Sequence, residues 1–182
     1  LAASQEQKTK PTQHSVKDLL SLGIQPDVIV CRSEIAISDE LKAKIALFCN
    51  VPQENVIENL DLPLLYEVPL AMEREGLAEI VCRRFGYKCE QSDMKDWHDM
   101  VEALSAPLNK VRIALVGKYA ALHDAYLSIV EALKHGGISS RSEIEIKWVD
   151  ADEVTDSTVD ELLGDVDGVL VPGGFGTRGI EG

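Results

Sequence analysis

The fold class is decided by the stretch Val111-Arg112-Ile113-Ala114-Leu115-Val116-Gly117-Lys118-Tyr119. An almost unbroken apolar run, rich in β-branched residues, is typical of a strand buried in a parallel sheet, and the glycine after it marks a turn. The chain continues with an amphipathic helix at 124–134, a half-buried strand at 143–149, a short helix at 158–163 and a further strand at 169–171. This alternation of strands and helices predicts the start of a doubly wound parallel sheet.

Two details refine this half of the chain. Gly136 and Gly137 are expected to stop the amphipathic helix, because glycine is favoured just past the end of a helix. Ile144, Ile146 and Trp148 alternate with polar residues, so they are expected to face inward from the second strand.

Two turns in this half lie at the carboxyl ends of expected strands, where open α/β sheets bind ligands. Pro172-Gly173-Gly174-Phe175-Gly176 follows a strand that we expect to be buried, and its backbone N–H groups, unshielded by a Cβ atom, suit an anionic or carbonyl oxygen. A simple tight turn is the alternative. Gly117-Lys118-Tyr119 ends the first strand, and its lysine suits an anion; an exposed lysine in a strand-to-loop turn is the alternative.

The first half of the chain begins with helix and strand signals. Ser15 is expected to cap a helix that reaches about Leu22, with Gly23 as its stop. Residues 27–31 form an apolar, β-branched run that is typical of a buried parallel strand. Ser38 is expected to cap a second helix. The apolar face of that helix is expected to consist of Leu41, Ile45, Leu47 and Phe48.

Shorter elements follow. Residues 56–57 predict a weak strand, and Asp61-Leu62-Pro63 is expected to open a helical stretch. Pro69 should kink or divide that stretch, because proline lacks the N–H of a helical hydrogen bond. Gly76 separates it from a further helix at 77–85.

The segment Lys8-Thr9-Lys10-Pro11-Thr12-Gln13-His14-Ser15 is interpreted as a polar loop that leads into a helix N-terminus. Unpaired backbone N–H groups and the helix dipole attract anions there. Two lysines and two threonines at such a place are typical of a polyphosphate cradle. A solvated basic loop before a capped helix is the alternative, since short basic motifs occur often.

Charge and cysteine content narrow the function classes. The formal net charge is −13, so the chain should repel nucleic acid and anionic membranes, and a small nucleotide is the expected phosphate ligand. No apolar run approaches the roughly 20 residues that span a bilayer. The four cysteines, Cys31, Cys49, Cys82 and Cys89, form no CxxC pair, which predicts no metal site and reduced thiols in a cytoplasmic protein.

A linker helix is expected between the two halves. Residues 91–109 are polar at first and then helical, and we place the domain boundary near Asn109. The chain lacks an initiator methionine, and residues 179–182 stop in a loop after a strand. It is therefore expected to be an internal piece of a longer protein.

Ordered motifs along the chain closely resemble the CTP synthase family, whose members are glutamine-dependent amidoligases that make CTP from UTP. The motifs that carry the resemblance are residues 8–16, 43–52, 116–119, 131–137 and 171–176. The resemblance implies an α/β chain with the end of a P-loop-like synthetase domain at 1–90. The interdomain linker helix would be 91–109, and 110–182 would be the first part of a flavodoxin-like class I glutamine amidotransferase domain.

The resemblance also implies site residues. The residues expected to bind the triphosphate of UTP, a site that the feedback inhibitor CTP shares, are Lys8, Thr9, Lys10, Pro11, Thr12, Gln13 and Lys44. Leu60, Asp61 and Leu62 fall where the family contacts ATP through its adenine end. Gly174 resembles the glycine that holds glutamine, and Gly173 resembles the backbone donor of the oxyanion hole.

Other parts of the family's machinery are expected outside residues 1–182. These are the ATP phosphate loop, the carboxylates that bind Mg²⁺, and the nucleophilic cysteine with its His–Glu pair. The resemblance further implies a homotetramer, activation by GTP, and no catalysis by the fragment itself. The alternative function is a non-catalytic nucleotide-binding module or a stand-alone amidotransferase-like domain.

Overall fold

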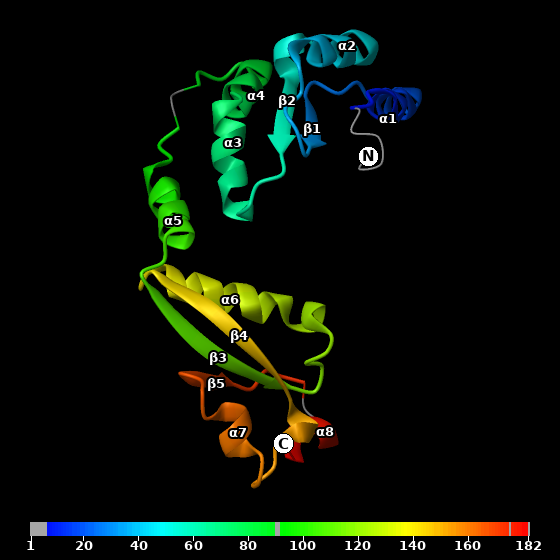
Figure 1. Ribbon diagram of the computed structural model, residues 1–182. Coiled ribbons are helices and arrows are strands. Elements are labelled where there is room, and N and C mark those ends of the chain that lie inside the picture. The colour runs from blue at the N-terminus through cyan, green and yellow to red at the C-terminus, as the bar shows by residue number, and fades with distance from the viewer. Residues whose placement is uncertain (1–6, 90–91, 175, 182) are drawn as a thin grey trace. The chain divides into compact units, whose positions relative to one another are not determined.

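The computed structural model of the chain describes residues 7–89, 92–174 and 176–181 (Figure 1). It consists of two compact units, residues 1–98 and 99–182. The domain limits expected from the sequence, 1–90, 91–109 and 110–182, stay predictions. No helix among the described residues is long and apolar enough to cross a membrane.

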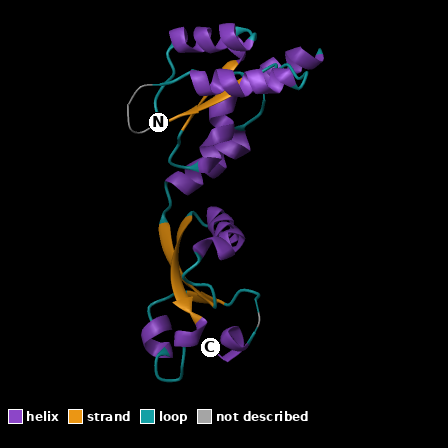
Figure 2. Cartoon of the chain, turned by 90° about the vertical axis from the view of Figure 1, so that its right-hand side faces the viewer, coloured by secondary structure: helices purple, strands orange, loops and turns teal. Residues whose placement is uncertain are grey.

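The first unit is built on a pair of parallel strands, in which Ile29 lies opposite Val56 and Ser33 lies opposite Leu60. Its elements are α1 Lys10–Ser21, β1 Ile29–Ser33, α2 Asp39–Cys49, β2 Val56–Leu60, α3 Val68–Arg74 and α4 Leu77–Phe85. Short 3₁₀ turns at Gln53–Asn55 and Leu65–Glu67 lie before β2 and α3. Helix α5, Lys95–Ser105, follows these elements. Figure 2 shows helices on both sides of the two strands.

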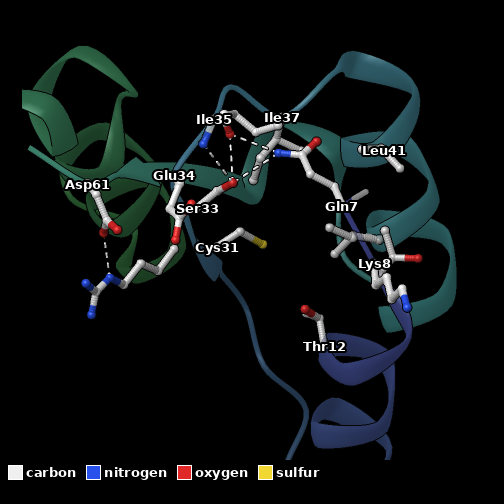
Figure 3. Close-up of a pocket in the computed structure, with 13 residues that line it drawn as sticks. Gln7, Lys8, Thr12, Cys31, Ser33, Glu34, Ile35, Ile37, Leu41 and Asp61 are labelled. Carbon is white, nitrogen blue, oxygen red and sulfur yellow. Dashed lines mark hydrogen bonds and ion pairs between the residues drawn. The ribbon is translucent and has the colours of Figure 1, made fainter. Parts of the chain in front are cut away.

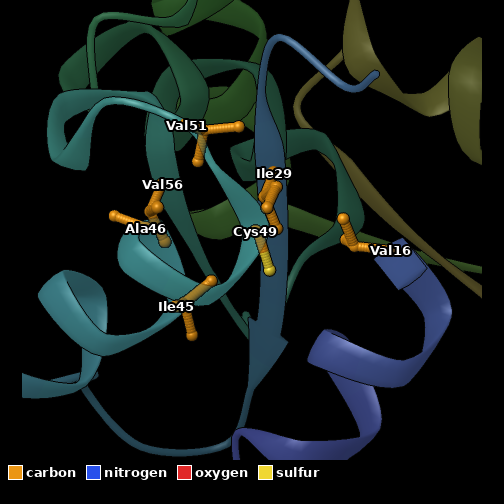
Figure 4. Close-up of a cluster of buried hydrophobic side chains, with 7 residues drawn as sticks. All are labelled: Val16, Ile29, Ile45, Ala46, Cys49, Val51 and Val56. Atoms are coloured by element: carbon orange, nitrogen blue, oxygen red, sulfur yellow. The ribbon is translucent and has the colours of Figure 1, made fainter. Parts of the chain in front are cut away.

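The core of this unit lies between α1, α2 and one face of the strands (Figure 4). It is formed by Val16, Ile29, Ile45, Ala46, Cys49, Val51 and Val56. Side chains alternate along a strand, so Ile57 faces the other way and is also buried, on the side of α3. The expected apolar face of α2 was partly wrong. Leu47 and Phe48 are 78% and 59% exposed, because the buried stripe of α2 runs through Ile45, Ala46 and Cys49.

Helix α1 begins at Lys10 and not after Ser15, so the interpretation of residues 10–15 as a loop was wrong. Pro11 occupies the first turn, where its missing N–H costs no hydrogen bond and its fixed φ angle suits a helix. The N–H of Gln13 donates to the carbonyl of Thr9 at 3.1 Å, and its side-chain amide donates to Thr9 Oγ1 at 3.0 Å. The first turn is thus closed by Thr9 and Gln13.

Proline likewise starts α3. Pro69 lies in the first turn of α3 and does not divide a longer helix, and the segment from Asp61 to Pro63 is not helical. Two other expectations for this unit are confirmed, whereas the strand expected to be buried at 27–31 is β1, which begins at Ile29 and leaves Val30 48% exposed. Ser38 Oγ accepts from the N–H of Leu41 at 3.3 Å at the start of α2, and Gly76, with a φ angle of 75°, separates α3 from α4.

The carboxylate of Glu75, at the end of α3, ties three elements of the first unit together. Its Oε2 atom accepts from the N–H of Glu58 in β2 at 3.0 Å and from Lys42 Nζ in α2 at 3.1 Å. Partial burial raises the pKa of Glu75, but these two donors outweigh that effect, so the pKa lies below its usual value.

The second unit contains three parallel strands in the order β4-β3-β5. Its elements are β3 Asn109–Gly117, α6 Leu127–Ile138, β4 Ser142–Asp150, α7 Val159–Leu163, β5 Gly168–Leu170 and α8 Thr177–Glu181, with 3₁₀ turns at His123–Tyr126 and Ala151–Glu153. The order and the parallel pairing confirm the predicted α/β class. Ile144, Ile146 and Trp148 pair with Val111, Ile113 and Leu115 and are half-buried, as expected.

Helices cover both faces of this sheet, α6 on one side and α7 on the other (Figure 1). On the α7 side, Ala114 and Val116 of β3 pack with Val149, Ala151 and the half-buried leucines of α7. Strand β5 was expected to be buried, yet Val169 and Val171 are 51% and 63% exposed. Among the described residues β5 pairs with β3 alone and lies at the edge of the three strands, so no strand shields its outer edge.

Helix α6 does not stop at Gly136 and Gly137 but runs through both to Ile138. Gly137 is buried against β4, and a Cβ atom there would lie 2.5 Å from the carbonyl oxygen of Ser142 and 3.1 Å from Ile144. Gly137 therefore permits a close approach of helix and strand, and it does not end the helix.

We predict that Gly137→Ala destabilises the second unit by about 1–2 kcal/mol, because the clash with backbone outweighs the higher helix propensity of alanine. Gly136→Ala is the matched control. A Cβ atom at Gly136 meets no atom within 4 Å, so this substitution should stabilise by about 0.5 kcal/mol. Urea unfolding, followed through Trp148 in a Trp97→Phe background, measures both. Equal effects of the two substitutions would contradict the close-packing role.

Glu75→Gln should destabilise the first unit by about 1 kcal/mol at pH 7, because it removes a charge-assisted hydrogen bond. A carboxylate whose folded pKa is depressed adds stability above its unfolded pKa, near 4.5, and that stability is lost as the pH falls through the folded pKa. The difference between the variant and the parent should therefore shrink below about pH 4. Trp97, which donates to the carbonyl of Tyr66 at 2.7 Å, reports the unfolding in a Trp148→Phe background.

The exposed Glu54, 3.7 Å from Arg83, supplies the control for that measurement. Glu54→Gln should change the free energy of unfolding by less than about 0.5 kcal/mol at either pH. A Glu75→Gln effect that stayed constant from pH 7 to pH 3 would show that the carboxylate charge is not what ties the elements together.

Candidate functional site

A cavity of about 800 Å³ lies at the carboxyl end of β1 in the first unit (Figure 3). Its apolar part is formed by Cys31, Ile37, Leu41 and Ile45. Its polar part comes from the segment before α1, the first turn of α1, the last residues of β1 and the residues that follow β1 and β2. The cavity therefore lies where parallel strands end, which is the usual ligand-binding edge of an α/β sheet.

Three of the residues expected to bind phosphate line this cavity. Lys8 is exposed and, among the described residues, has no hydrogen bond or ion pair. Thr9 is 8% exposed, and its hydroxyl accepts the Gln13 amide. Thr12 is half-buried, and its hydroxyl is directed toward the cavity (Figure 3). Lys8 and Thr12 thus offer a free ammonium group and a hydroxyl to a ligand.

The remaining expected phosphate ligands do not line the cavity. Lys10 and Pro11 are exposed on the first turn of α1, and the amide of Gln13 is bonded to Thr9. Lys44 is exposed on α2, although its neighbour Ile45 does line the cavity. Their roles in binding stay predictions.

The ATP-binding prediction falls on the end of β2. Asp61 lines the cavity and accepts from Arg32 Nε at 2.7 Å, whereas Leu60 and Leu62 are half-buried outside it. This hydrogen bond is the main reason why the pKa of Arg32 is raised. The N–H of Asp61 donates to the carbonyl of Ser33 at 3.0 Å, which joins the two strand ends. Contact with ATP itself stays a prediction.

Gln7 is a site residue that the sequence did not reveal. Its side-chain amide lies within hydrogen-bonding distance of Ser33 Oγ at 3.0 Å and of the carbonyl oxygens of Ile35 and Ala36 at 2.9 and 3.2 Å. The dashed lines of Figure 3 show how this amide joins the segment before α1 to the loop after β1. Gln7 therefore fixes the position of Lys8. No local pattern signals this, because the partners are 26 to 29 residues apart.

Two cysteines of the first unit, Cys31 and Cys49, have thiols whose pKa is raised, which does not favour the nucleophilic thiolate. Burial is the main cause that raises the pKa of Cys31, which lines the cavity, and it also raises the pKa of Cys49. Both thiols therefore stay protonated near neutral pH. Among the described residues, no group of three or more His, Cys, Asp and Glu side chains is placed to hold a metal ion.

The second unit presents its glycine turn at the carboxyl end of β5. Gly173 and Gly174 are exposed, and Gly174 has a φ angle of 122°, a conformation that residues with a Cβ rarely adopt. Lys118, which follows β3, lies against this turn. Phe175 lies outside the described residues. The assignment of Gly173 to an oxyanion hole and of Gly174 to glutamine stays a prediction.

Comparison with known proteins places both units in one family. The family model described as CTP synthase N-terminus matches residues 1–87, and the model described as glutamine amidotransferase class-I matches residues 121–182. A CTP synthase of Ruminiclostridium cellulolyticum is 57% identical over 182 residues, which is 100% of this chain and 34% of that protein.

Two further relatives agree. A CTP synthase of Clostridium perfringens is 56% identical over 182 residues, and one of Symbiobacterium thermophilum is 58% identical over 186 residues. Each match covers 100% of this chain and 34% of the relative, so the chain spans about a third of the length of these proteins. At this identity over its whole length, with both family models matched in order, the chain belongs to the CTP synthase family.

Proposed function

We propose that this chain forms part of an enzyme that converts UTP, ATP, glutamine and water to CTP, ADP, phosphate and glutamate. The cavity at the end of β1 carries the proposal. Its free ammonium and hydroxyl groups belong to Lys8 and Thr12, in a segment that matches the CTP synthase N-terminus. Because the chain as a whole is acidic, a local cation is needed to hold a polyphosphate.

In this proposal the cavity binds the triphosphate of UTP and, in competition, that of the feedback inhibitor CTP. Lys8 neutralises phosphate charge through contacts of about 1.5–3 kcal/mol, and Thr12 donates its hydroxyl. Lys10, Pro11, Gln13 and Lys44 would join when the ligand and a neighbouring subunit complete the pocket. A homotetramer is part of the proposal for that reason.

ATP would approach the end of β2, at Leu60, Asp61 and Leu62. The family uses Mg²⁺ with ATP to activate the carbonyl oxygen of the pyrimidine. The described residues gather no metal-binding set, so we assign no step of this chain to the metal. P-loop-like character of the first domain is likewise a proposal.

The second unit is proposed to begin a flavodoxin-like glutaminase domain, in the part that matches the class I glutamine amidotransferases. The N–H of Gly173 would stabilise the oxyanion that forms when glutamine is attacked, and Gly174 would hold the substrate. GTP would activate glutamine hydrolysis by this domain. The attacking thiolate would belong to residues outside 1–182, so residues 1–182 alone are proposed to be inactive. We expect the enzyme to act in the cytoplasm, without nucleic acid or membrane partners.

In the full-length enzyme, Lys8→Ala should raise the UTP concentration for half-maximal rate about tenfold or more and weaken inhibition by CTP. Glutamine hydrolysis should remain. Lys17→Ala is the matched control, because Lys17 is an exposed lysine of α1, the helix that follows Lys8, and it does not line the cavity. Steady-state kinetics with varied UTP measure both variants. An unchanged UTP requirement in Lys8→Ala would exclude a role of Lys8 in binding the triphosphate of UTP.

Gln7→Met should raise the UTP requirement about threefold to tenfold, because the loss of the amide frees the segment that carries Lys8 while side-chain size is kept. Gln25→Met is the control, since the Gln25 amide also donates to backbone, to the carbonyl of Asn50 at 3.2 Å, but does not line the cavity. The same kinetic measurement applies. Equal effects of the two substitutions would mean that Gln7 acts only through general stability.

A further inference from the structure

Lys118 and the glycine turn meet at the carboxyl edge of the second sheet. Strands β3 and β5 are adjacent and parallel, with Leu115 opposite Leu170. Counted from that pair, Lys118 and Gly173 each lie three residues further along the chain. The loops that leave two neighbouring parallel strands are therefore side by side, in the crevice where open α/β sheets bind ligands.

The side chain of Lys118 lies directly against the backbone of this turn. A Cβ atom built on Gly174 would be 3.6 Å from Lys118 Cε, and one built on Gly176 would be 3.8 Å from Lys118 Nζ. Apart from chain neighbours, no other described atom lies within 4 Å of either position. Within the described part of the chain, Lys118 is thus the side chain that packs on this face of the turn.

No carboxylate of the described residues pairs with the ammonium group of Lys118. It lies 4.9 Å from the centre of the Tyr119 ring, at the distance of a cation–π contact. The described residues provide it with no ion pair or hydrogen bond, although the side chain is half-buried. A half-buried cation without a counter-charge raises the electrostatic potential at the turn beside it.

The backbone on both sides of Lys118 is fixed by contacts with the aromatic ring of Tyr126. Tyr126 is 4% exposed, and its hydroxyl accepts from the N–H of Tyr119 at 3.3 Å. A Cβ atom at Gly117 would lie 2.5 Å from this hydroxyl, so the backbone before Lys118 approaches Tyr126 as only glycine permits. Tyr126 in turn stacks on Trp148 with a ring distance of 6.4 Å.

We propose that Lys118 is a positioning residue for glutamine hydrolysis, an inference that rests on the proposed glutaminase function. Gly174 has a φ angle of 122° and no side chain, so the turn has many conformations open to it unless an outside contact selects one. Lys118 supplies that contact. Its stem packs on Gly174 and Gly176, and its charge favours the arrangement in which the turn receives a developing oxyanion.

The experiment uses the full-length enzyme and three variants. Lys118→Met keeps the stem and removes the charge, Lys118→Arg keeps the charge, and Lys134→Met removes an exposed lysine of α6 in the same unit, paired with Glu131 at 2.7 Å. Two rates are measured for each: ammonia release from glutamine, and CTP formation driven by added ammonium salt, which needs no glutaminase chemistry.

For Lys118→Met, kcat of glutamine hydrolysis should fall about tenfold or more, while KM for glutamine changes less than about threefold, because the turn acts on the transition state. Lys118→Arg should recover most of the lost rate. Lys134→Met should match the parent, and ammonia-driven CTP formation should stay within about twofold in all variants.

Three other outcomes would overturn the inference, and each points to a different cause. A parental kcat in Lys118→Met would mean that this lysine is only a solvated side chain, with the proposed function intact. A parallel fall of the ammonia-driven rate would mean a general effect on folding. A parent enzyme that makes CTP from ammonia but releases none from glutamine would refute the glutaminase proposal itself, and with it the role of Lys118.

Discussion

Parallel pairing of strands requires a crossover after each strand, and it therefore brings the segments that leave neighbouring strands to one edge of a sheet. Both candidate sites of this chain depend on that constraint. In the first unit, the ends of β1 and β2 are joined by the hydrogen bond from Asp61 N–H to the Ser33 carbonyl, and the cavity lies beside them. In the second unit, the ends of β3 and β5 bring Lys118 to the glycine turn.

The strand ends can form a binding site only if the segments that connect the strands pack closely enough to hold them in position. In the second unit this closeness depends on missing side chains. Gly137 lets α6 approach the backbone of β4, and Gly117 lets β3 approach the hydroxyl of Tyr126. In the first unit a charge serves the same purpose, because the Glu75 carboxylate binds donors from α2 and β2 at once. Half-burial of that carboxylate is offset by its two donors.

Much of this fold could be predicted from the sequence, because the strands are short β-branched runs and the helices have caps such as Ser38. The misplaced boundaries lie at prolines and at a glycine. The sequence places Pro11 in a loop and predicts that Pro69 kinks or divides a helix, whereas both prolines lie in the first turn of a helix, where proline fits. Gly137 was read as a stop, whereas its role is set by a strand that passes close by. The exposure of Val169 could not be predicted either, since it depends on which strands lie beside β5.

The charge of the chain helps to explain which residues of the two candidate sites are available to a ligand. In this acidic chain, with a net charge of −13, many of the described cations have a carboxylate partner, as Lys42, Arg112 and Lys147 do. Charges further apart than about 8 Å are screened at physiological salt, so local pairing decides which cations remain available to a ligand. Lys8 in the first unit and Lys118 in the second remain available to a ligand, because neither has a carboxylate partner among the described residues. A motif can propose such lysines, but only the packing around Gln7 and Tyr126 determines where their charge is held.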